Sequence, residues 1–358
     1  MSAKKLMQVD RLFPLETVAQ RMTLLNRFWA GEDIGRPIFL VRSSLETNGA
    51  DPETRVRSFV ARLEAEAKVP WDVLPCFDCG TYPVGLATAF GGRVVASSTG
   101  ANPWIEPVVH QAEDVYRLKP PGVLDGMVGE KVQDYQYALE RVGGYIPPRV
   151  PDMQGPLMVA AMLWKEEDFI LAMYDKPEAV HHLLNLATDH IIAVYHYFRD
   201  TYPGALMVSC PVCYMPQELG VGMTEDFMHL LSPALYAEFG LPYVNRIARE
   251  FGGLLIHCCG VFKQHWDTVK QFHNLRGLDT QYPYSHPDEV FSAFPNIVHS
   301  MSLDYAESQR NFSTGDPDAF LKFLIEHTPR QLRWQIWANA DDLAGLQRQM
   351  QLVQSRWT

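Results

Sequence analysis

Short apolar runs alternate with longer amphipathic stretches along most of the chain. The short runs are rich in β-branched and aromatic residues, a pattern typical of strands buried on both faces. They lie at residues 37–42, 205–210, 253–258, 296–303 and 332–338. Between them, apolar residues recur at helical spacing. Such an alternation predicts a parallel α/β architecture.

The helical stretches have recognisable starts. One runs over residues 166–198 and is interrupted before Pro177, where proline begins a new helix. Another, at 232–251, opens with Ser232 and Pro233 in the order that helix starts favour, and a third lies at 316–326. The length fits one (β/α)8 TIM barrel with an N-terminal helical extension better than an open sheet. We therefore expect a single domain over residues 1–358, since neither a repeat nor a linker interrupts the pattern.

Composition excludes several classes of protein. With 47% hydrophobic and 20% charged residues, the chain is globular rather than disordered. A net charge of −11 disfavours a nucleic-acid groove, which needs a basic stripe. No apolar run reaches the roughly 18 residues of a membrane span, and the first ten residues lack the apolar stretch of a signal peptide. Six cysteines are too few for a disulfide scaffold in a chain of this length, so we expect a cytoplasmic protein.

Polar residues follow nearly every predicted strand. In barrel enzymes the active site is built from the carboxyl ends of several strands, so this placement predicts a site there. The residues concerned are Arg42, Asp152, Gln154, Cys210, His257, Cys259, Asp279 and Asp304.

The sharpest local signal is the segment Gly252–Gly260. Alternate residues of a strand share a face, so His257 and Cys259 point the same way and Cys258 points opposite. An imidazole and a thiolate on one face form half of a tetrahedral zinc site. The alternative is a buried strand end whose histidine bonds a backbone carbonyl and whose cysteines fill the core.

Two further cysteine pairs, Cys210/Cys213 and Cys76/Cys79, have CxxC spacing but lie too far apart in sequence for a zinc module. Pocket lining or packing is the simpler interpretation of each. Asp152 and Gln154 precede Gly155-Pro156 and either hold a polar substrate or cap the turn that begins there.

Several of these segments resemble the uroporphyrinogen decarboxylase superfamily. The resemblance is carried by residues 36–42, 71–92, 103–107, 150–163, 174–178 and 224–243, and by the segment 257–260 that follows them. It covers most of the chain and implies a (β/α)8 barrel that often pairs as a homodimer.

The residues favour one branch of this superfamily. True decarboxylases carry two arginines four residues apart on the first strand. Here Arg42 matches the first but Glu46 takes the second place, where a carboxylate would repel an acidic substrate. Asp78 alone would stand in for the decarboxylases' pyrrole-binding aspartate. Cobalamin-dependent methyltransferases, by contrast, hold zinc with a His-x-Cys pair, which His257 and Cys259 match.

The methyltransferase resemblance implies a third zinc ligand, yet no cysteine follows Cys259. We look first to Cys210 or Cys213 for this ligand, and then to Asp304 or Asn339.

Glu225 or Asp226, together with Asp152, would orient the substrate or take a proton. Arg42, Asp78 and Gln154 would bind substrate. The implied partner is a corrinoid protein or free cobalamin, because the chain has no cobalt-ligating Asp-x-His-x-x-Gly motif of its own.

Three hypotheses follow. The leading one is a zinc-dependent methyltransferase that moves a methyl group between a corrinoid and a thiol, methylamine or methoxy compound. The second is a metal-free decarboxylase or lyase of a small carboxylate or tetrapyrrole-type substrate, anchored by Arg42. The third is a barrel that binds a corrinoid or tetrapyrrole without turning it over.

Overall fold

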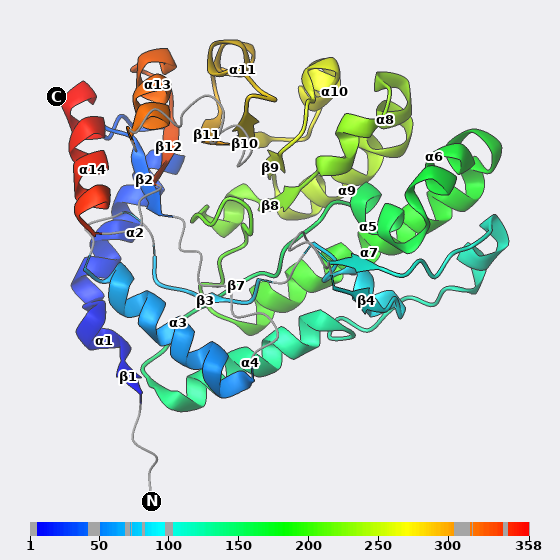
Figure 1. The fold of residues 1–358 in the computed structure, drawn as a ribbon, viewed down its shortest axis with the longest axis horizontal. Helices are drawn as coiled ribbons and strands as arrows, with labels where there is room; N and C mark the ends of the chain where they lie inside the picture. Colours follow the sequence, from blue (N-terminus) through cyan, green and yellow to red (C-terminus); the bar gives the residue numbers. More distant parts are fainter. Residues whose placement is uncertain are drawn as a thin grey trace, which may run out of the picture.

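Helices surround a set of parallel strands (Figure 1). A computed structural model of the chain describes residues 6–41, 51–68, 72, 74–80, 83–96, 103–303, 316, 318–338 and 343–357. The helices are α1 (Val9–Leu12), α2 (Leu15–Trp29), α3 (Pro52–Glu66), α4 (Met127–Arg141), α5 (Pro156–Leu163), α6 (Glu166–Asp175), α7 (Pro177–Thr201), α8 (Pro233–Phe239), α9 (Leu241–Phe251), α10 (Trp266–Val269), α11 (Pro287–Ala293), α13 (Ala319–His327) and α14 (Leu343–Trp357). The strands are β1 (Met7–Gln8), β2 (Ile38–Val41), β3 (Phe77–Asp78), β4 (Val94–Val95), β5 (Trp104–Ile105), β6 (Val142–Gly143), β7 (Pro148–Arg149), β8 (Val221–Thr224), β9 (Leu254–Cys258), β10 (Leu275–Tyr282), β11 (Val298–Leu303) and β12 (Trp334–Ala338).

The parallel strands follow one another around a ring. Six of them form a sheet in the order β2-β12-β11-β10-β9-β8. Parallel bridges then join Gly222 of β8 to Val208, and Leu206 to Arg149 of β7, which pairs with β3. The N–H of Asp72, shortly before β3, donates to the carbonyl of Phe39 in β2. This hydrogen bond closes the ring of strands. The α/β fold of TIM-barrel class is confirmed, with α1 and α2 as the helical extension before β2.

Most predicted elements form where the pattern places them. The apolar runs at 253–258, 296–303 and 332–338 become β9, β11 and β12. The long helical stretch divides at Lys176 into α6 and α7, and the next one divides at Gly240 into α8 and α9. The run at 205–210 differs, since it takes part in two isolated bridges and forms no continuous strand.

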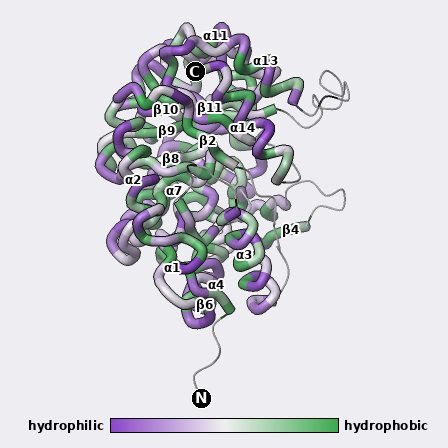
Figure 2. The backbone as a smooth tube through the Cα atoms, turned by 90° about the vertical axis from the view of Figure 1, so that its left-hand side faces the viewer, coloured by the Kyte–Doolittle hydropathy of each residue, from purple (hydrophilic) through white to green (hydrophobic). Residues whose placement is uncertain are grey.

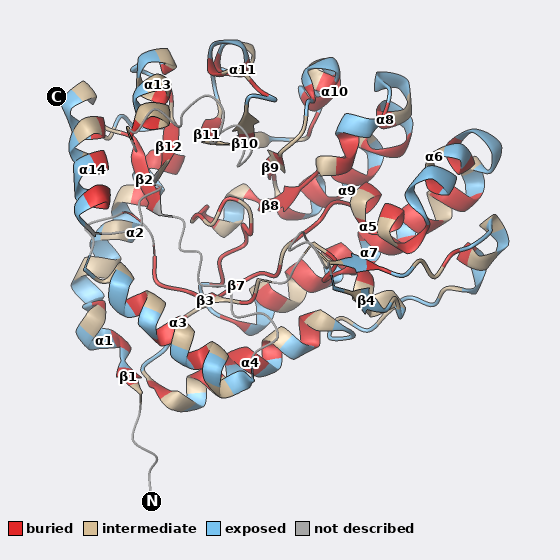
Figure 3. Cartoon of the chain, viewed as in Figure 1, coloured by how far each residue is buried: buried red, intermediate tan, exposed pale blue. Residues whose placement is uncertain are grey.

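Most helices have a buried inward face and an exposed outward face, whereas the described residues of the ring strands are buried or half-buried (Figure 3). Along the chain, hydrophobic and hydrophilic stretches alternate accordingly (Figure 2). Within the part of the chain that the structure describes, no helix is long and apolar enough to cross a membrane.

A small apolar cluster fills the inside of the ring, and we call it the lumen cluster. Its strand residues alternate with those packed against the outer helices: Leu255 belongs to it, whereas Leu254 and Ile256 belong to the larger outer core. Its buried members are Leu25, Phe28, Trp29, Ile38, Leu40, Leu74, Val208, Cys213, Met215, Leu255 and Val298.

The loop at 210–216 takes part in this lumen cluster. It joins the bridged segment at 205–210 to β8 without an outer helix longer than one 3-10 turn. Cys213 and Met215 pack among the inward strand residues. At the amino ends of the strands, the indole N–H of Trp29 on α2 donates to the carbonyl of Tyr214 at 2.6 Å. The loop therefore packs inside the ring and contacts α2 through the hydrogen bond between Tyr214 and Trp29.

Candidate metal centre

The end of β9 places His257 and Cys259 close together. β9 ends at Cys258, and Cys259 is the first residue after it. The inward position Leu255 lies in the lumen cluster, and two-residue alternation gives His257 the same face. The ligand atom of Cys259 lies within 4.8 Å of that of His257. Cys258 packs in the outer core, as the sequence predicts. The side chain of His257 is only 12% exposed, so its ring nitrogens need partners within the protein.

Both nitrogens of His257 face carboxylates. Nδ1 lies 2.6 Å from Oδ2 of Asp279, a hydrogen bond between neighbouring strands. Nε2 lies 4.0 Å from Oδ1 of Asp226. The same Oδ1 accepts the backbone N–H of Cys259 at 2.8 Å, so Asp226 fixes the backbone at Cys259.

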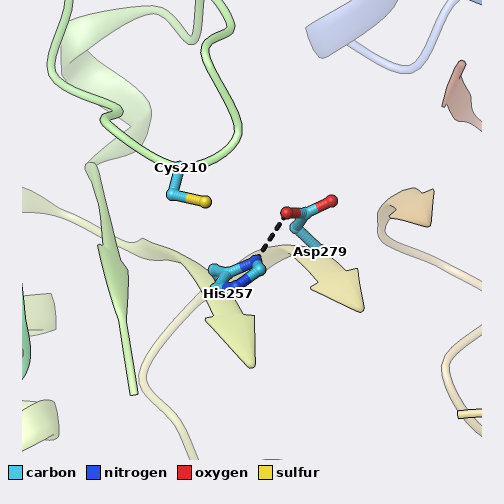
Figure 4. Close-up of side chains that lie close together, drawn as sticks. All are labelled: Cys210, His257 and Asp279. Carbon is cyan, nitrogen blue, oxygen red and sulfur yellow. Dashed lines mark hydrogen bonds and ion pairs between the residues drawn. The ribbon is translucent and has the colours of Figure 1, made fainter. Parts of the chain in front are cut away.

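Two overlapping groups of potential metal ligands share His257. One comprises Cys210, His257 and Asp279 (Figure 4), and the other comprises Asp226, His257 and Cys259. Within each group the ligand atoms lie within 4.8 Å of one another. Among the described residues neither group contains both Cys210 and Cys259, so a single ion bound by both thiols would require a small movement of the 210–216 loop.

The electrostatics around His257 favour a cation. Burial lowers the pKa of His257, but Cys210, Asp279 and Cys259 outweigh this effect and raise the pKa well above its usual range. Burial raises the pKa of Cys210 and of Cys259, and the neighbouring His257 opposes the increase. The thiols therefore become thiolates most readily beside a positive charge, which a proton on His257 or a metal ion can provide.

The donor set fits zinc. Imidazole, thiolate and carboxylate are the ligands that Zn²⁺ takes, and catalytic sites use three of them with one position open for substrate. Histidines that bind a metal through one ring nitrogen usually donate a hydrogen bond from the other nitrogen to a carboxylate or carbonyl. The hydrogen bond from Nδ1 of His257 to Asp279 fits this pattern and leaves Nε2 for the metal. On this chemistry, His257, Cys259 and either Asp226 or Cys210 could hold the ion.

Cys213 lies outside both groups of described residues. It is fully buried in the lumen cluster and faces the amide of Gln335. Burial raises the pKa of its thiol strongly, which is the behaviour of a packing residue.

Three polar side chains predicted from the sequence are buried on the segments beside this group. Burial raises the pKa of Asp152 to about 6, opposed by the Gln154 amide, which donates to Asp152 at 2.9 Å. Burial, and then the nearby Asp226, raise the pKa of Glu225 to about 8. Among the residues that the structure describes, neither oxygen of Glu225 has a hydrogen-bond partner, nor does Oε1 of Gln154. Protonated carboxyl groups in such positions can give or take a proton near neutral pH.

Asp78 is already paired within the protein. On β3 it forms a close ion pair with Arg149 of β7, and Arg62 of α3 lies 3.7 Å from its other oxygen. Arg149 also donates to the carbonyl of Ser209, next to Cys210. The predicted substrate ligand Arg42 lies outside the described residues, as do Glu46, Asp304 and Asn339.

Sequence reasoning missed three contributors. Asp279 was noted only as a polar strand end, and Ser300 and Arg149 were not singled out. All three are inward residues of parallel strands in direct contact with the group or with its neighbours. The signal that could have found them is the position of polar residues at inward places of otherwise apolar strands.

Residues 79–285 match the family model described as uroporphyrinogen decarboxylase (URO-D). This segment covers more than half of the chain and includes both groups of potential ligands. The chain belongs to this family. Uroporphyrinogen decarboxylases from Xanthomonas axonopodis pv. citri (strain 306) and Xanthomonas euvesicatoria pv. vesicatoria (strain 85-10) are 40% and 39% identical to it over 87 residues. That match spans 24% of this chain and only 20% of each of these relatives.

A solved structure extends the likeness to nearly the whole fold. A methyltransferase from Methanosarcina mazei superposes with a TM-score of 0.68 and covers 94% of this chain and 98% of its own. The two sequences are 13% identical, so the likeness shows a shared fold. The fold shared with this structure thus extends over nearly the whole chain, well beyond the short segment that matches the Xanthomonas enzymes.

Proposed function

We propose that this chain is a zinc-dependent methyltransferase that moves a methyl group between a corrinoid and a thiol, methylamine or methoxy compound. The observation that carries the proposal is the pair formed by His257 on β9 and Cys259 directly after this strand, with Asp226 and Cys210 each within ligand distance of His257. The shared fold with a methyltransferase supports it. The corrinoid would come from a partner protein or as free cobalamin, and a homodimer stays a prediction.

The residues divide the work as follows. His257, Cys259 and a third ligand, Asp226 or Cys210, would hold the ion. A bound zinc ion supplies Lewis acidity, which lowers the pKa of a thiol or polarises a methoxy or methylamine group. Asp226 holds the backbone N–H of Cys259 in place. Asp152 and Glu225, whose pKa values burial raises, would take up or return the proton of the substrate, and Gln154 would orient it.

Metal analysis of untagged protein tests the proposal. We expect about one zinc ion per chain, lost in Cys259→Ser and retained in the matched control Cys258→Ala, whose side chain faces the outer core. Asp226→Asn and Cys210→Ser then identify the third ligand, since only the true ligand lowers zinc content. A folded wild-type protein that binds no zinc after supplementation would overturn the proposal.

A metal-free decarboxylase is the second candidate, because the Xanthomonas relatives are uroporphyrinogen decarboxylases. It predicts activity that survives His257→Ala and is lost in Arg42→Ala. Against it, Asp78 already forms a close ion pair with Arg149 and lies 3.7 Å from Arg62, so pyrrole N–H groups would compete with these arginines for its carboxylate. Binding of a corrinoid or tetrapyrrole without any product would instead support a non-catalytic barrel.

A further inference from the structure

We propose that Asp279 and Ser300 are positioning residues that fix the tautomer and the ring orientation of His257. The inference rests on the proposed function, because it assigns His257 Nε2 as the metal ligand. It concerns side-chain hydrogen bonds that join three neighbouring strands, β9, β10 and β11, on the side of His257 opposite Nε2.

The three residues occupy one row of the barrel. In the parallel register, His257 of β9 pairs with Asp279 of β10, and Asp279 pairs with Ser300 of β11. Residues in register on parallel strands point to the same side, so all three side chains face the inside of the ring. Asp279 and Ser300 are each 2% exposed, which excludes water from competing for their hydrogen bonds.

A continuous hydrogen-bonded chain links these side chains. Oδ2 of Asp279 accepts from Nδ1 of His257 at 2.6 Å, and Oδ1 of Asp279 accepts a close hydrogen bond from the hydroxyl of Ser300. Both carboxylate oxygens are therefore occupied by donors. The next residue in the row is Gln335 of β12, whose amide oxygen has no hydrogen-bond partner among the described residues. The series of side-chain hydrogen bonds therefore ends at Ser300.

These hydrogen bonds determine which ring nitrogen of His257 is available to bind a metal ion. A carboxylate can only accept, so in the neutral ring Nδ1 carries the proton and the lone pair of His257 lies on Nε2. Nε2 faces Asp226 at 4.0 Å, in the group that contains Cys259. The Ser300 hydroxyl holds the carboxylate in the plane that this hydrogen bond needs.

Asp279 also belongs to the group with Cys210, so its carboxylate has two alternative roles, metal ligand or hydrogen-bond partner of His257. Two ligands of one tetrahedral zinc ion, each bound at about 2.0–2.1 Å, lie about 3.3 Å apart. The 2.6 Å between Nδ1 and Oδ2 is shorter than that and is a hydrogen-bond distance. The geometry therefore assigns Asp279 to positioning rather than to coordination.

The test is zinc affinity of the metal-free protein, measured by competition with a chelator. We expect Asp279→Ala to weaken zinc binding about 10- to 100-fold. Asp279→Asn keeps an oxygen that can accept from Nδ1 and recovers part of this loss, whereas Ser300→Ala causes a smaller loss than Asp279→Ala. Asp267→Asn, an aspartate whose side chain is fully exposed, is the matched control and leaves affinity unchanged.

A second readout needs no metal. Histidine-selective ¹⁵N NMR of the metal-free protein, recorded at a pH high enough for the His257 ring to be neutral, reports which ring nitrogen carries the proton. We expect a protonated Nδ1 on His257 in the wild type and in Ser300→Ala, and a mixture of tautomers in Asp279→Ala. This measurement stands even if the wild type binds no zinc, so it separates failure of the positioning role from failure of the proposed function.

Two results would overturn the inference. One is a wild-type His257 that carries its proton on Nε2. The other is complete loss of zinc in Asp279→Asn, to the same extent as in Cys259→Ser, which would make Asp279 a ligand. Thermal unfolding of every variant confirms that each protein compared is folded.

Discussion

At the scale of single residues, Gly155 and Glu225 show how tightly the site is packed. A Cβ atom added to Gly155 would lie 1.7 Å from Oε2 of Glu225 and 3.2 Å from the carbonyl of Thr224. Glu225 is completely buried, so its carboxyl group cannot swing into solvent to make room. The backbone of Gly155 has an ordinary φ of −69°, so the requirement for glycine here is one of space alone.

We therefore expect Gly155→Ala to lower the free energy of unfolding by about 1–3 kcal/mol, the usual cost of overpacking. Urea denaturation measures the change. Shortening the opposing side chain in the double variant Gly155→Ala/Glu225→Ala restores space, so its destabilisation should be less than the sum of the two single variants. Additive effects of the two changes would contradict the steric explanation.

The sequence predicts some residues of the site and not others. His257 and Cys259 follow from strand alternation, a local rule that needs only the neighbours in the chain. The contact of Asp226 with the Cys259 backbone, and that of Asp279 with His257, join residues far apart in sequence. Such contacts depend on strand order and register, and a single sequence fixes neither.

At the scale of elements, Arg149 ties three segments together. From β7 it pairs with Asp78 on β3 and donates to the carbonyl of Ser209, which precedes Cys210. The Ser209 hydroxyl in turn accepts the N–H of Met153 at 3.1 Å. Arg149 thereby fixes the start of the loop that carries Cys210.

We expect Arg149→Met to cost about 3 kcal/mol in the free energy of unfolding, because it leaves the Asp78 carboxylate without its close ion pair and with only the backbone N–H of Gly80 and the more distant Arg62 among its described partners. Adding Asp78→Asn removes the uncompensated charge and should recover part of that loss. Chemical denaturation of the two proteins gives the comparison. An Arg149→Met protein as stable as wild type would show that the ion pair contributes nothing net.

The order of strands and helices was predictable because hydrophobic periodicity reports it directly. The segment at 205–210 shows where that rule fails. Its apolar run predicts a strand, but the following loop enters the lumen and pairs with few backbone groups, leaving only the bridges at Leu206 and Val208. The hydrophobic pattern of a sequence reports which residues are buried. Residues inside the barrel can be buried without belonging to a continuous strand, as the segment at 205–210 shows.

At the scale of the whole molecule, stability depends on pH through two buried histidines. Burial lowers the pKa of His190 on α7 to about 4 and that of His299 on β11 to about 4. Their rings lie against Phe90 and Phe291 respectively. In the unfolded chain their pKa is about 6.5, so below that pH the unfolded state binds more protons than the folded state.

Each of these histidines therefore stabilises the fold fully above pH 6.5, and the contribution is lost as pH falls toward 4. Replacing one of them, as in His190→Leu, removes one titrating group. Between pH 6.5 and 4, the free energy of unfolding of wild type should fall by about 3 kcal/mol more than that of the variant. Denaturation of metal-free protein across this range checks it, and parallel pH profiles for the two proteins would refute it.

The loop at 210–216 has a further consequence for folding. Its carbonyl at Tyr214 accepts from the indole of Trp29, which lies 185 positions away in sequence, and Cys213 and Met215 pack in the lumen cluster. A contact between such distant parts of the chain forms only after the entropy of closing the intervening loop has been lost, which slows folding. The lumen cluster therefore cannot be completed until the middle of the chain has reached α2.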